Sequence, residues 1–234
     1  MLKGEIDADT AFLLHNGWLS HVPPEFGAAF LAHAHWRNVP AGESISHAGD
    51  QSKTIMGVSR GVVSIFTALS APDAPIVTIG HPGIWFGYVP MFSKLARGVS
   101  VAARSDVRLV YIAQSEVEVL LSQRPEWWRH FAALGVLYGH TALNVAADLM
   151  IRDSKRRCIA AILRLADCRF VDRPGGRPIE APLSQEELAA MSNLSHTSVS
   201  TIVRELEETG LIALGYRTIV LVDTDRLRAI VDDV

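Results

Sequence analysis

The stretch LSQEELAAMSNLSHTSVSTIVRELEETGLI, residues 183–212, decides the fold of the C-terminal part of the chain. Ser184 is followed three residues later by Glu187, which fits a capping box and predicts that a helix begins there. The run SNLS interrupts this helix at Asn193, a residue type that accepts a left-handed backbone at lower cost than most. Ser195 is suited to cap a second helix, and Gly210 is suited to end it. The stretch therefore predicts two helices joined by a tight turn.

The residues that follow predict a β-hairpin. LIALGYRTIVLVD, residues 211–223, has the pattern of two short strands around GYR, and DTDRLRAIV closes with a short helix. The inner faces of the two preceding helices are predicted to carry Leu188, Ala189, Met191, Val199, Ile202, Val203 and Leu206. Helix, turn, helix and hairpin together are typical of a winged helix-turn-helix domain, which places its second helix in the major groove of DNA. A winged domain that docks on protein is the alternative.

The predicted DNA contacts lie mainly in the first turns of the second helix, where side chains reach base edges and hydroxyls reach phosphates. They are Ser195, His196, Thr197, Ser198, Ser200, Thr201 and Arg204. Arg204 has an alternative role as the ion-pair partner of Glu207 or Glu208 on its own helix. Glu205, Glu207 and Glu208 are expected to form a solvated face away from DNA.

Net charge supplies little of the predicted DNA affinity. The chain has a formal net charge of −3, and residues 151–234 contain twelve Lys and Arg against thirteen Asp and Glu. Affinity must therefore come from local clustering and from dimerisation. One cluster consists of Arg152, Lys155, Arg156 and Arg157. It either adds non-specific affinity or is a solvated helix face.

The N-terminal half predicts a domain of short strands. The candidate strands are TIMGV (54–58), GVVSIFTAL (61–69), PIVTIG (75–80), GVSVAAR (98–104) and VRLVYIA (107–113). The breaks SRG, SAPDAP and GHPG have the composition of turns. Many short strands with little helix between them favour a barrel or jelly roll.

A long helix is predicted from about Pro125 to Ile151, with a length of about 40 Å. Its seam, at alternating steps of three and four, consists of Phe131, Leu134, Tyr138, Thr141, Val145 and Asp148. Such a seam predicts a partner helix in a homodimer, and packing on the chain's own barrel is the alternative. We therefore expect an α+β protein with a strand domain (10–122), a dimerisation helix (123–153) and a DNA-binding domain (154–234).

Composition predicts a cytoplasmic protein with no membrane segment. Cys158 and Cys168 offer neither a disulfide framework nor metal-ligand spacing, and we expect both to be reduced thiols. No apolar run is long enough to span a bilayer, and the N-terminus MLKGEIDADT is too acidic for a signal peptide. No cofactor is expected.

The chain resembles the CRP/FNR family of bacterial regulators from about Phe12 to its end. Residues 183–212 match the family's DNA-binding signature nearly throughout. PAGESISHAGD (40–50) is similar to the opening of its β-roll, GHPGIWFG (80–87) to the glycine segment before its ligand cassette, and RGVSVAARSDVRLVYI (97–112) to the strand after it. The resemblance implies an N-terminal double-stranded β-roll of the cyclic-nucleotide-binding type, a dimer helix and a C-terminal winged domain. It also makes RNA polymerase a candidate partner.

The ligand cassette departs from the family pattern. The resemblance implies FGE followed by Arg-Ser, where Glu binds the ribose hydroxyl and Arg pairs with the cyclic phosphate. This chain has Tyr88 in place of the Glu, keeps Arg97 and has Gly98 in place of the Ser. The Thr-Ser pair expected on the dimer helix falls on Ala142 and Leu143, beside Thr141. Cyclic AMP is therefore not the expected effector.

Other effectors remain open. An unknown effector is expected near Gly87, Tyr88, Arg97, Gly98, Thr141 and Asn144. Arg97 either holds another anion or is a surface residue in a loop. An apolar pocket is an alternative for a further set of residues, which otherwise belong to the core: Trp85, Phe86, Tyr88, Phe92, Tyr138 and Leu143. A third interpretation is a constitutive DNA binder without an effector.

The recognition helix also departs from its commonest family form. Many members carry Arg, Glu and Arg at the base-reading places, which here fall on His196, Thr197 and Thr201. Without paired Arg residues, bidentate contacts to guanine are lost. We expect an inverted-repeat site unlike the commonest family half-site.

An enzyme is the rival class. Gly27, His33 and His35 are spaced like the start of the metal motif of cupins, and His and carboxylate ligands suit iron, manganese or zinc. The cupin Glu is expected within about five residues, whereas Glu43 follows eight residues after His35, and residues 26–33 also have the pattern of a helix. No catalytic triad, phosphate loop or carboxylate pair is recognisable. We therefore do not expect an enzyme.

Overall fold

The computed structural model describes residues 3–67, 76–170 and 179–233. It divides into two compact units, Met1–Tyr138 and Gly139–Val234. Helix α5 (Trp128–Leu149) is therefore divided between the two units. The predicted SAPDAP turn (70–75) and the loop VDRPGGRP (171–178) lie outside the described residues.

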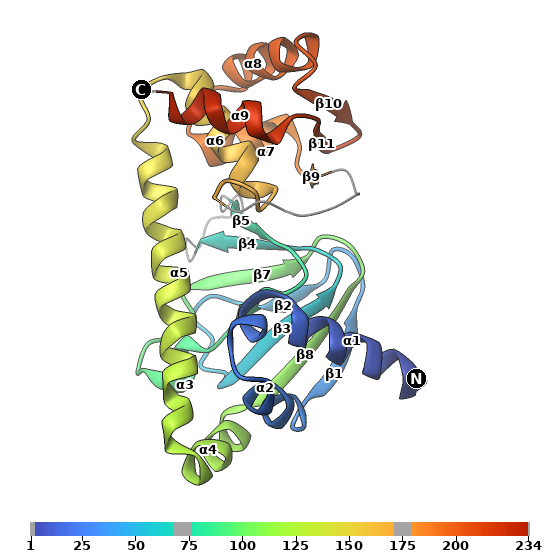
Figure 1. Cartoon of the computed structure of the whole chain (residues 1–234), viewed down its shortest axis with the longest axis vertical. Helices are drawn as coiled ribbons and strands as arrows, with labels where there is room; N and C mark the ends of the chain where they lie inside the picture. The colour runs from blue at the N-terminus through green and yellow to red at the C-terminus, as the bar shows by residue number, and fades with distance from the viewer. Residues whose placement is uncertain (1–2, 68–75, 171–178, 234) are drawn as a thin grey trace. The chain divides into compact units, whose positions relative to one another are not determined.

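The first unit contains two four-stranded antiparallel sheets (Figure 1). One sheet has the order β1-β8-β3-β6, formed by His35–Val39, Val107–Ala113, Thr54–Arg60 and Trp85–Phe86. The other has the order β2-β7-β4-β5, formed by Ser44–Ser46, Val99–Ala103, Val63–Thr67 and Ile76–Gly80. All five strands predicted from the sequence are present. The architecture is the expected two-sheet roll.

The alternation of side chains along β8 builds a core on each face of its sheet. Leu109 faces one cluster together with Val63 and Val101 of the opposite sheet. The next residue, Val110, belongs to the cluster on the other face. The β1-β8-β3-β6 sheet is thus buried on both sides, which explains why VRLVYIA is almost continuously apolar.

Helices cover the second face of this sheet. They are α1 (Lys3–His15), the 3₁₀ turn η1 (Gly17–His21), α2 (Pro24–Leu31) and α4 (Gln114–Gln123), with the short α3 (Val89–Phe92) and the 3₁₀ turn η2 (Pro125–Trp127). The predicted helix over residues 26–33 is confirmed as α2. Sequence analysis did not predict α1 and α4.

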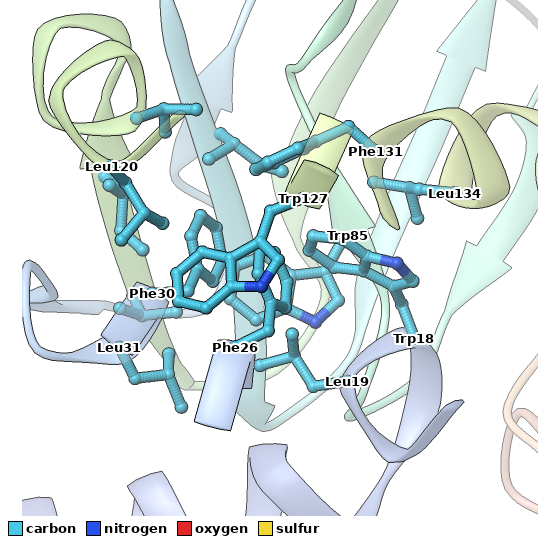
Figure 2. Packing of buried hydrophobic residues seen from close by; sticks show 14 of the residues in the cluster. Trp18, Leu19, Phe26, Phe30, Leu31, Trp85, Leu120, Trp127, Phe131 and Leu134 are labelled. Carbon is cyan, nitrogen blue, oxygen red and sulfur yellow. The ribbon is translucent and has the colours of Figure 1, made fainter. Parts of the chain in front are cut away.

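An aromatic cluster joins these helices to the sheet and to the start of α5 (Figure 2). The ring of Trp18 lies 5.6 Å from Phe30, 5.7 Å from Trp85 and 5.4 Å from Phe131 between ring centroids. Trp18 Nε1 also donates a hydrogen bond to the carbonyl of His130 at 3.0 Å. Trp85 is therefore a core residue. This agrees with the second of the two roles considered for it in the sequence, which were an effector pocket and the core.

The two ends of the seam predicted on the long helix pack against the protein's own chain. Phe131 and Leu134 are buried in the aromatic cluster, and Tyr138 packs against it. Asp148 is buried by residues of the second unit. The two ends of the seam are thus occupied by the protein's own chain, as the alternative predicted, whereas Thr141 between them is exposed and Val145 is half-buried. The large exposed apolar side chains of α5 and its end are Trp128, Val136, Leu137, Leu143, Leu149 and Met150.

The second unit contains the predicted helix-turn-helix and wing. Its elements after α5 are α6 (Ser154–Leu165), β9 (Ile179–Ala181), α7 (Gln185–Ser192), α8 (His196–Glu208), β10 (Ile212–Gly215), β11 (Thr218–Leu221) and α9 (Thr224–Asp232). The sheet has the order β10-β11-β9 and is antiparallel. The winged helix-turn-helix fold is therefore confirmed.

Two general features complete the description of the chain. Among the described residues, no helix combines the length and the hydropathy needed to cross a membrane. Cys158 and Cys168 are both buried and free. Burial raises the pKa of the Cys158 thiol to about 12, against the opposing effect of Arg157. Cys158 is thus a buried core thiol in this structure.

Candidate DNA interface and effector site

The turn between α7 and α8 is built as the sequence predicts. Ser184 Oγ accepts a hydrogen bond from the amide of Glu187, and the Glu187 carboxylate accepts one from the amide of Ser184. Asn193 has φ 52° and ψ 51°, the left-handed conformation that ends α7. Ser195 then caps α8 by accepting from the amide of Ser198 at 3.1 Å. These local bonds fix the direction in which α8 leaves the turn.

The two faces of α8 have opposite character. Val199, Val203 and Leu206 are fully buried, and Ile202 is nearly so. On the outer face, an exposed row at steps of four and three consists of Thr197, Thr201, Arg204 and Glu208. His196 and Ser195 are exposed beside the first turn. The N-terminal turns of α8 are therefore accessible to DNA.

The predicted DNA-contacting residues fall into two groups. Ser195, His196, Thr197, Thr201 and Arg204 are exposed, whereas Ser198 and Ser200 are half-buried. The Ser200 hydroxyl donates to Oε1 of Gln185 at 2.9 Å, so it holds α8 against α7. Ser200 is therefore a positioning residue in this structure, and sequence reasoning missed its partner Gln185. The Ser195 hydroxyl also contacts that of Ser198 at 2.8 Å.

The glutamates of α8 are all exposed, as predicted, and two of them also have partners on other elements. Glu205 forms an ion pair with Lys155 of α6. Glu207 Oε1 accepts a hydrogen bond from the amide of Leu214 on the wing at 3.2 Å. Among the described residues, Arg204 has no ion pair with Glu207 or Glu208. The acidic residues thus position α8 and the wing, and Arg204 keeps its charge available.

The basic cluster at the start of α6 has structural partners. Arg156 donates to the carbonyl of Val231 on α9 at 3.1 Å through Nε. Arg157 donates to the carbonyls of Ser192 and Ile151 at 2.9 and 2.6 Å. Arg152 is exposed and lies before the helix. Only part of this cluster is therefore available to DNA, which differs from both interpretations made from sequence.

The wing presents an exposed tip that sequence analysis did not single out. Tyr216 is 94% exposed, and Arg217 next to it has φ 52°. Arg217 Nη2 lies 3.5 Å from a carboxylate oxygen of Glu187, the residue that completes the cap of α7. Gly215 pairs with Thr218, so Tyr216 and Arg217 form the two-residue turn of the hairpin that was predicted around GYR. The tip thus lies within reach of the start of α7.

A buried ion cluster ends α5. Asp148 is 4% exposed, and its two carboxylate oxygens lie 3.5 Å from Nε of Arg164 and of Arg169. Arg169 Nη2 also lies 2.9 Å from Asp232 of α9. Burial lowers the pKa of Arg164, and Asp148 opposes this shift. The cluster ties the end of α5 to α6 and α9 within the second unit.

Arg97 of the predicted effector site is buried. It is 5% exposed, so the interpretation as a surface arginine is wrong. Its Nη2 donates to the carbonyls of Ser52 and Thr54 and to the Thr54 hydroxyl at 3.2, 3.1 and 2.9 Å. Burial lowers its pKa, which nearby Asp50 opposes.

Glycine at position 87 makes room for this arrangement. Gly87 has φ +87°, and a Cβ there would lie 2.6 Å from both Arg97 Nη1 and the carbonyl oxygen of Thr54. Gly98 is different, because a Cβ at that position would have no atom within 4 Å. The first glycine is thus required by packing, whereas the second leaves open space.

The cavity at these residues is small. It has a volume of about 40 Å³ and is lined by Gly87, Arg97, Gly98, Ser46 and apolar side chains. Pockets for drug-sized ligands have volumes of about 300–1,000 Å³. The cavity in this structure is therefore too small for a nucleotide.

Tyr88 lies outside this cavity. It lines a separate open groove of about 510 Å³ in the first unit, together with Phe92, Leu95 and Trp128. Burial raises the pKa of the Tyr88 hydroxyl, and its ring stacks on that of Tyr138 at 6.1 Å. Phe86 is instead buried between the sheets, and Leu143 is 70% exposed. The six residues suggested for an apolar pocket thus do not form one lining.

Two further predicted residues lie on α5. Thr141 is exposed and Asn144 is half-buried, both in the second unit. Their role as effector contacts stays a prediction.

The histidines of the cupin-like motif do not form a metal site in the described part of the chain. His35 Nε2 lies 3.1 Å from Glu116, and the described residues contain no group of three or more candidate ligands. His33 therefore does not belong to a group of three or more candidate ligands among the described residues. The prediction of Phe26–His33 as helix accounts for this segment better.

Comparison with known proteins agrees with this architecture. Residues 36–124 match the model of the cyclic nucleotide-binding domain, and residues 156–230 match that of the Crp-like helix-turn-helix domain. The cAMP-activated global transcriptional regulator CRP of Pasteurella multocida is 24% identical over 197 residues, which cover 83% of this chain and 93% of that protein. The Cyclic AMP receptor protein of Thermus thermophilus is 27% identical over a stretch that covers 84% of this chain and 88% of that protein.

Solved structures share the fold. A CRP/FNR-family transcriptional regulator of Thermus thermophilus has a TM-score of 0.65 at 23% identity, covering 85% of this chain and 98% of its own. FixK2 of Bradyrhizobium japonicum has a TM-score of 0.67 at 20% identity, and the match covers 83% of this chain and 95% of FixK2. The cyclic nucleotide-binding model matches the N-terminal part and the Crp-like helix-turn-helix model matches the C-terminal part. The chain therefore belongs to the CRP/FNR family of DNA-binding transcription regulators. Its relatives are regulators, a class of protein that is not enzymatic.

Proposed function

We propose that this protein is a homodimeric regulator that binds an inverted-repeat promoter site through α8 and does not respond to cyclic AMP. The observation that carries the proposal is the pairing of an exposed, capped recognition helix with a cavity of about 40 Å³ where a nucleotide would bind. The first feature supports DNA binding. The second argues against a nucleotide effector.

The DNA contacts are proposed from the exposure of α8. His196 and Thr197 are placed to read base edges, and Thr201 extends this face by one turn. Ser195 and Ser198 at the helix N-terminus suit phosphate oxygens, as does Arg204 further along. Because no arginine occupies the first turn, guanine recognition is weaker and DNA shape contributes more to specificity.

A second copy of the chain is the proposed partner of α5. Val136, Leu143 and Met150 recur at steps of seven and are 71%, 70% and 81% exposed. A seven-residue apolar repeat is the pattern with which two helices pack along each other. A monomer rarely leaves such a row in water. A two-fold dimer presents two recognition helices and hence predicts an inverted repeat.

The effector differs from that of the relatives whose names describe activation by cyclic AMP. Tyr88 and Gly98 replace the Glu and Ser that the family pattern implies, so two anchors for the nucleotide are lost. The retained Arg97 uses Nη2 on backbone carbonyls and on Thr54. A regulator that binds DNA constitutively is the second candidate, since a cavity of about 40 Å³ favours it as well.

The setting follows from this role. A promoter-bound dimer works in the cytoplasm beside RNA polymerase, which we propose as its protein partner. No membrane and no cofactor enter the proposal.

Dimerisation and DNA binding are tested together with Leu143→Glu. A charge at this position opposes helix pairing, so the variant should sediment as a monomer and lose affinity for the inverted repeat. Val119→Glu is the matched control, because Val119 is 51% exposed on α4 and is not part of the seven-residue repeat. A Leu143→Glu protein that stays dimeric contradicts the proposed interface. A dimer that selects no DNA sequence contradicts the proposed function.

A further inference from the structure

One side chain of α5 contacts two points of the segment that carries the altered ligand cassette. The Tyr138 hydroxyl accepts a hydrogen bond from the backbone amide of Trp85 at 3.0 Å. The Tyr138 ring also stacks on the ring of Tyr88, with centroids 6.1 Å apart and 20° between the ring planes. All three residues belong to the first unit. Tyr138 thus connects α5 to the cassette by a hydrogen bond and by a ring contact.

The hydrogen bond joins α5 to a rigid part of the roll. β6 is an edge strand of its sheet, so its outer backbone groups have no neighbouring strand to bind. The Trp85 amide has its acceptor on α5 instead. Trp85 itself is buried, and its ring packs 5.7 Å from Trp18 and 5.4 Å from Phe30 between centroids. A shift of Tyr138 away from the roll would therefore leave a backbone donor without its partner.

The ring contact stands where the family pattern implies a contact made by a ligand. That pattern places a nucleotide between the Glu of the cassette and a Thr-Ser pair on the dimer helix. Here Tyr88 replaces the Glu, and Ala142 and Leu143 replace the pair. Tyr88 is half-buried and reaches α5 directly through Tyr138. The cassette and the helix are thus joined by two side chains of the protein itself.

The place of Tyr138 on α5 determines which face of the helix stays free. Tyr138 is the last residue of the first unit, and α5 continues beyond it into the second unit. At 3.6 residues per turn, Val136 and Leu143 lie about 160° and about 140° from Tyr138 around the helix axis. Both are exposed and belong to the proposed dimer row. Fixing Tyr138 on the roll therefore keeps this row on the opposite side of the helix, free for a second copy.

We propose that Tyr138 is a positioning residue that holds α5 in the orientation in which two copies pair and bind DNA, and that Tyr88 takes the place of an external effector in this contact. The inference rests on the proposed function for DNA binding and favours its constitutive form. Because the contact belongs to the folded chain, the state that binds DNA is populated without a ligand. Removing either part of the contact shifts the population towards a state with lower affinity.

The hydroxyl and the ring are tested by different substitutions in the full-length protein. Tyr138→Phe keeps the ring and removes the acceptor for the Trp85 amide. A dimer loses two such bonds, so affinity for the selected inverted repeat should fall about tenfold. Tyr88→Ala removes the ring contact and should have a similar effect, whereas Tyr88→Phe keeps the ring and should bind DNA like the wild type. Fluorescence anisotropy measures these affinities well below the Tm of each variant, where a loss of stability alone leaves them unchanged.

Chemical rescue separates a replaced effector from a residue that only stabilises the fold. Tyr88 lines the open groove of the first unit, so Tyr88→Ala leaves a space that a small aromatic molecule can enter. The probe is 4-methylphenol, which has the structure of the tyrosine side chain. It should restore DNA affinity to Tyr88→Ala in a saturable manner and leave the wild type unchanged. Tyr111→Ala is the matched control, because Tyr111 stacks on His35 of β1 at 5.4 Å, and this variant should bind DNA like the wild type.

The outcomes distinguish this inference from the proposed function. Loss of affinity in Tyr138→Phe and Tyr88→Ala, with recovery of the second by 4-methylphenol, supports the inference. Wild-type affinity in both variants overturns it, as does a Tyr88→Ala protein that 4-methylphenol does not restore. Sedimentation measures dimerisation without DNA, and Tyr138→Phe should dissociate at a higher concentration than the wild type. A wild-type protein that dimerises in this way but selects no DNA sequence contradicts the proposed function and still supports the positioning role of Tyr138.

Discussion

The hydroxyl of Ser200 donates a hydrogen bond to Oε1 of Gln185 across the two helices of the helix-turn-helix, at 2.9 Å. One polar side chain of α8 is thus committed to the protein and is not free for DNA. The first helix of the motif thereby helps to set the orientation of the second.

Replacing Ser200 with Ala should act on stability more than on recognition. Loss of this half-buried hydrogen bond should lower the free energy of unfolding by about 0.5–1.5 kcal/mol. The ratio of affinities for specific and non-specific DNA should not change. Chemical denaturation and fluorescence anisotropy check the two parts. A changed sequence preference would show that Ser200 does contact bases.

Replacing His196 with Ala should act on recognition. His196 is exposed in the first turn of α8, so its loss should reduce affinity for the selected site about tenfold and affinity for random DNA much less. Arg204→Ala is the comparison, because a lost phosphate contact weakens binding to all sequences and reduces the salt slope by about one. Equal losses for His196→Ala on both kinds of DNA would remove its role in base reading.

Gly87→Ala and Gly98→Ala form a matched pair. At position 87 the new methyl group meets Arg97 and Thr54 and the backbone has φ +87°, so the loss of stability should be at least about 1–3 kcal/mol. At position 98 the methyl group enters open space, and the change should be neutral or stabilising by about 0.4–1 kcal/mol. Thermal and chemical unfolding measure both. Similar effects at the two positions would contradict the described packing of Arg97.

Asp148→Asn should destabilise the second unit strongly. The substitution leaves the buried guanidiniums of Arg164 and Arg169 without their shared carboxylate, which costs about 3–5 kcal/mol for a buried ion pair. Combining it with Arg164→Met should recover part of this loss, because one uncompensated charge is removed. A double-mutant cycle measures the coupling. Additive effects would mean that the cluster does not act as a unit.

Cys158 makes stability depend on alkaline pH. Burial raises the pKa of the folded thiol to about 12 from its ordinary value of 9.0, so the folded state keeps its proton longer than the unfolded chain. The stabilisation is complete below pH 9.0 and is lost as pH rises from there through 12. The wild type should therefore lose more stability over this range than Cys158→Ala. Parallel curves for the two proteins would contradict the shift.

Local rules made the helix-turn-helix readable from sequence. The capping box at Ser184, the left-handed Asn193 and the cap at Ser195 each depend on a few neighbouring residues. The strands of the roll were predictable for the same reason, since each carries its own apolar run between turn residues. The two-sheet arrangement then followed from the resemblance to the CRP/FNR family.

Interactions between distant segments were not readable in this way. The burial of Arg97 depends on the carbonyls of Ser52 and Thr54, more than forty residues away. The partners of Glu205 and Glu207, on α6 and on the wing, are likewise set by the tertiary fold. Both ends of the α5 seam are buried, but periodicity does not say which surface buries them.

The most direct test of the account is selection of genomic DNA fragments by the purified protein, with and without cyclic AMP. The account predicts that the same inverted-repeat motif is enriched in both conditions. A motif that appears only with cyclic AMP would show that the nucleotide enters despite Tyr88, Gly98 and the small cavity, and would contradict the central claim.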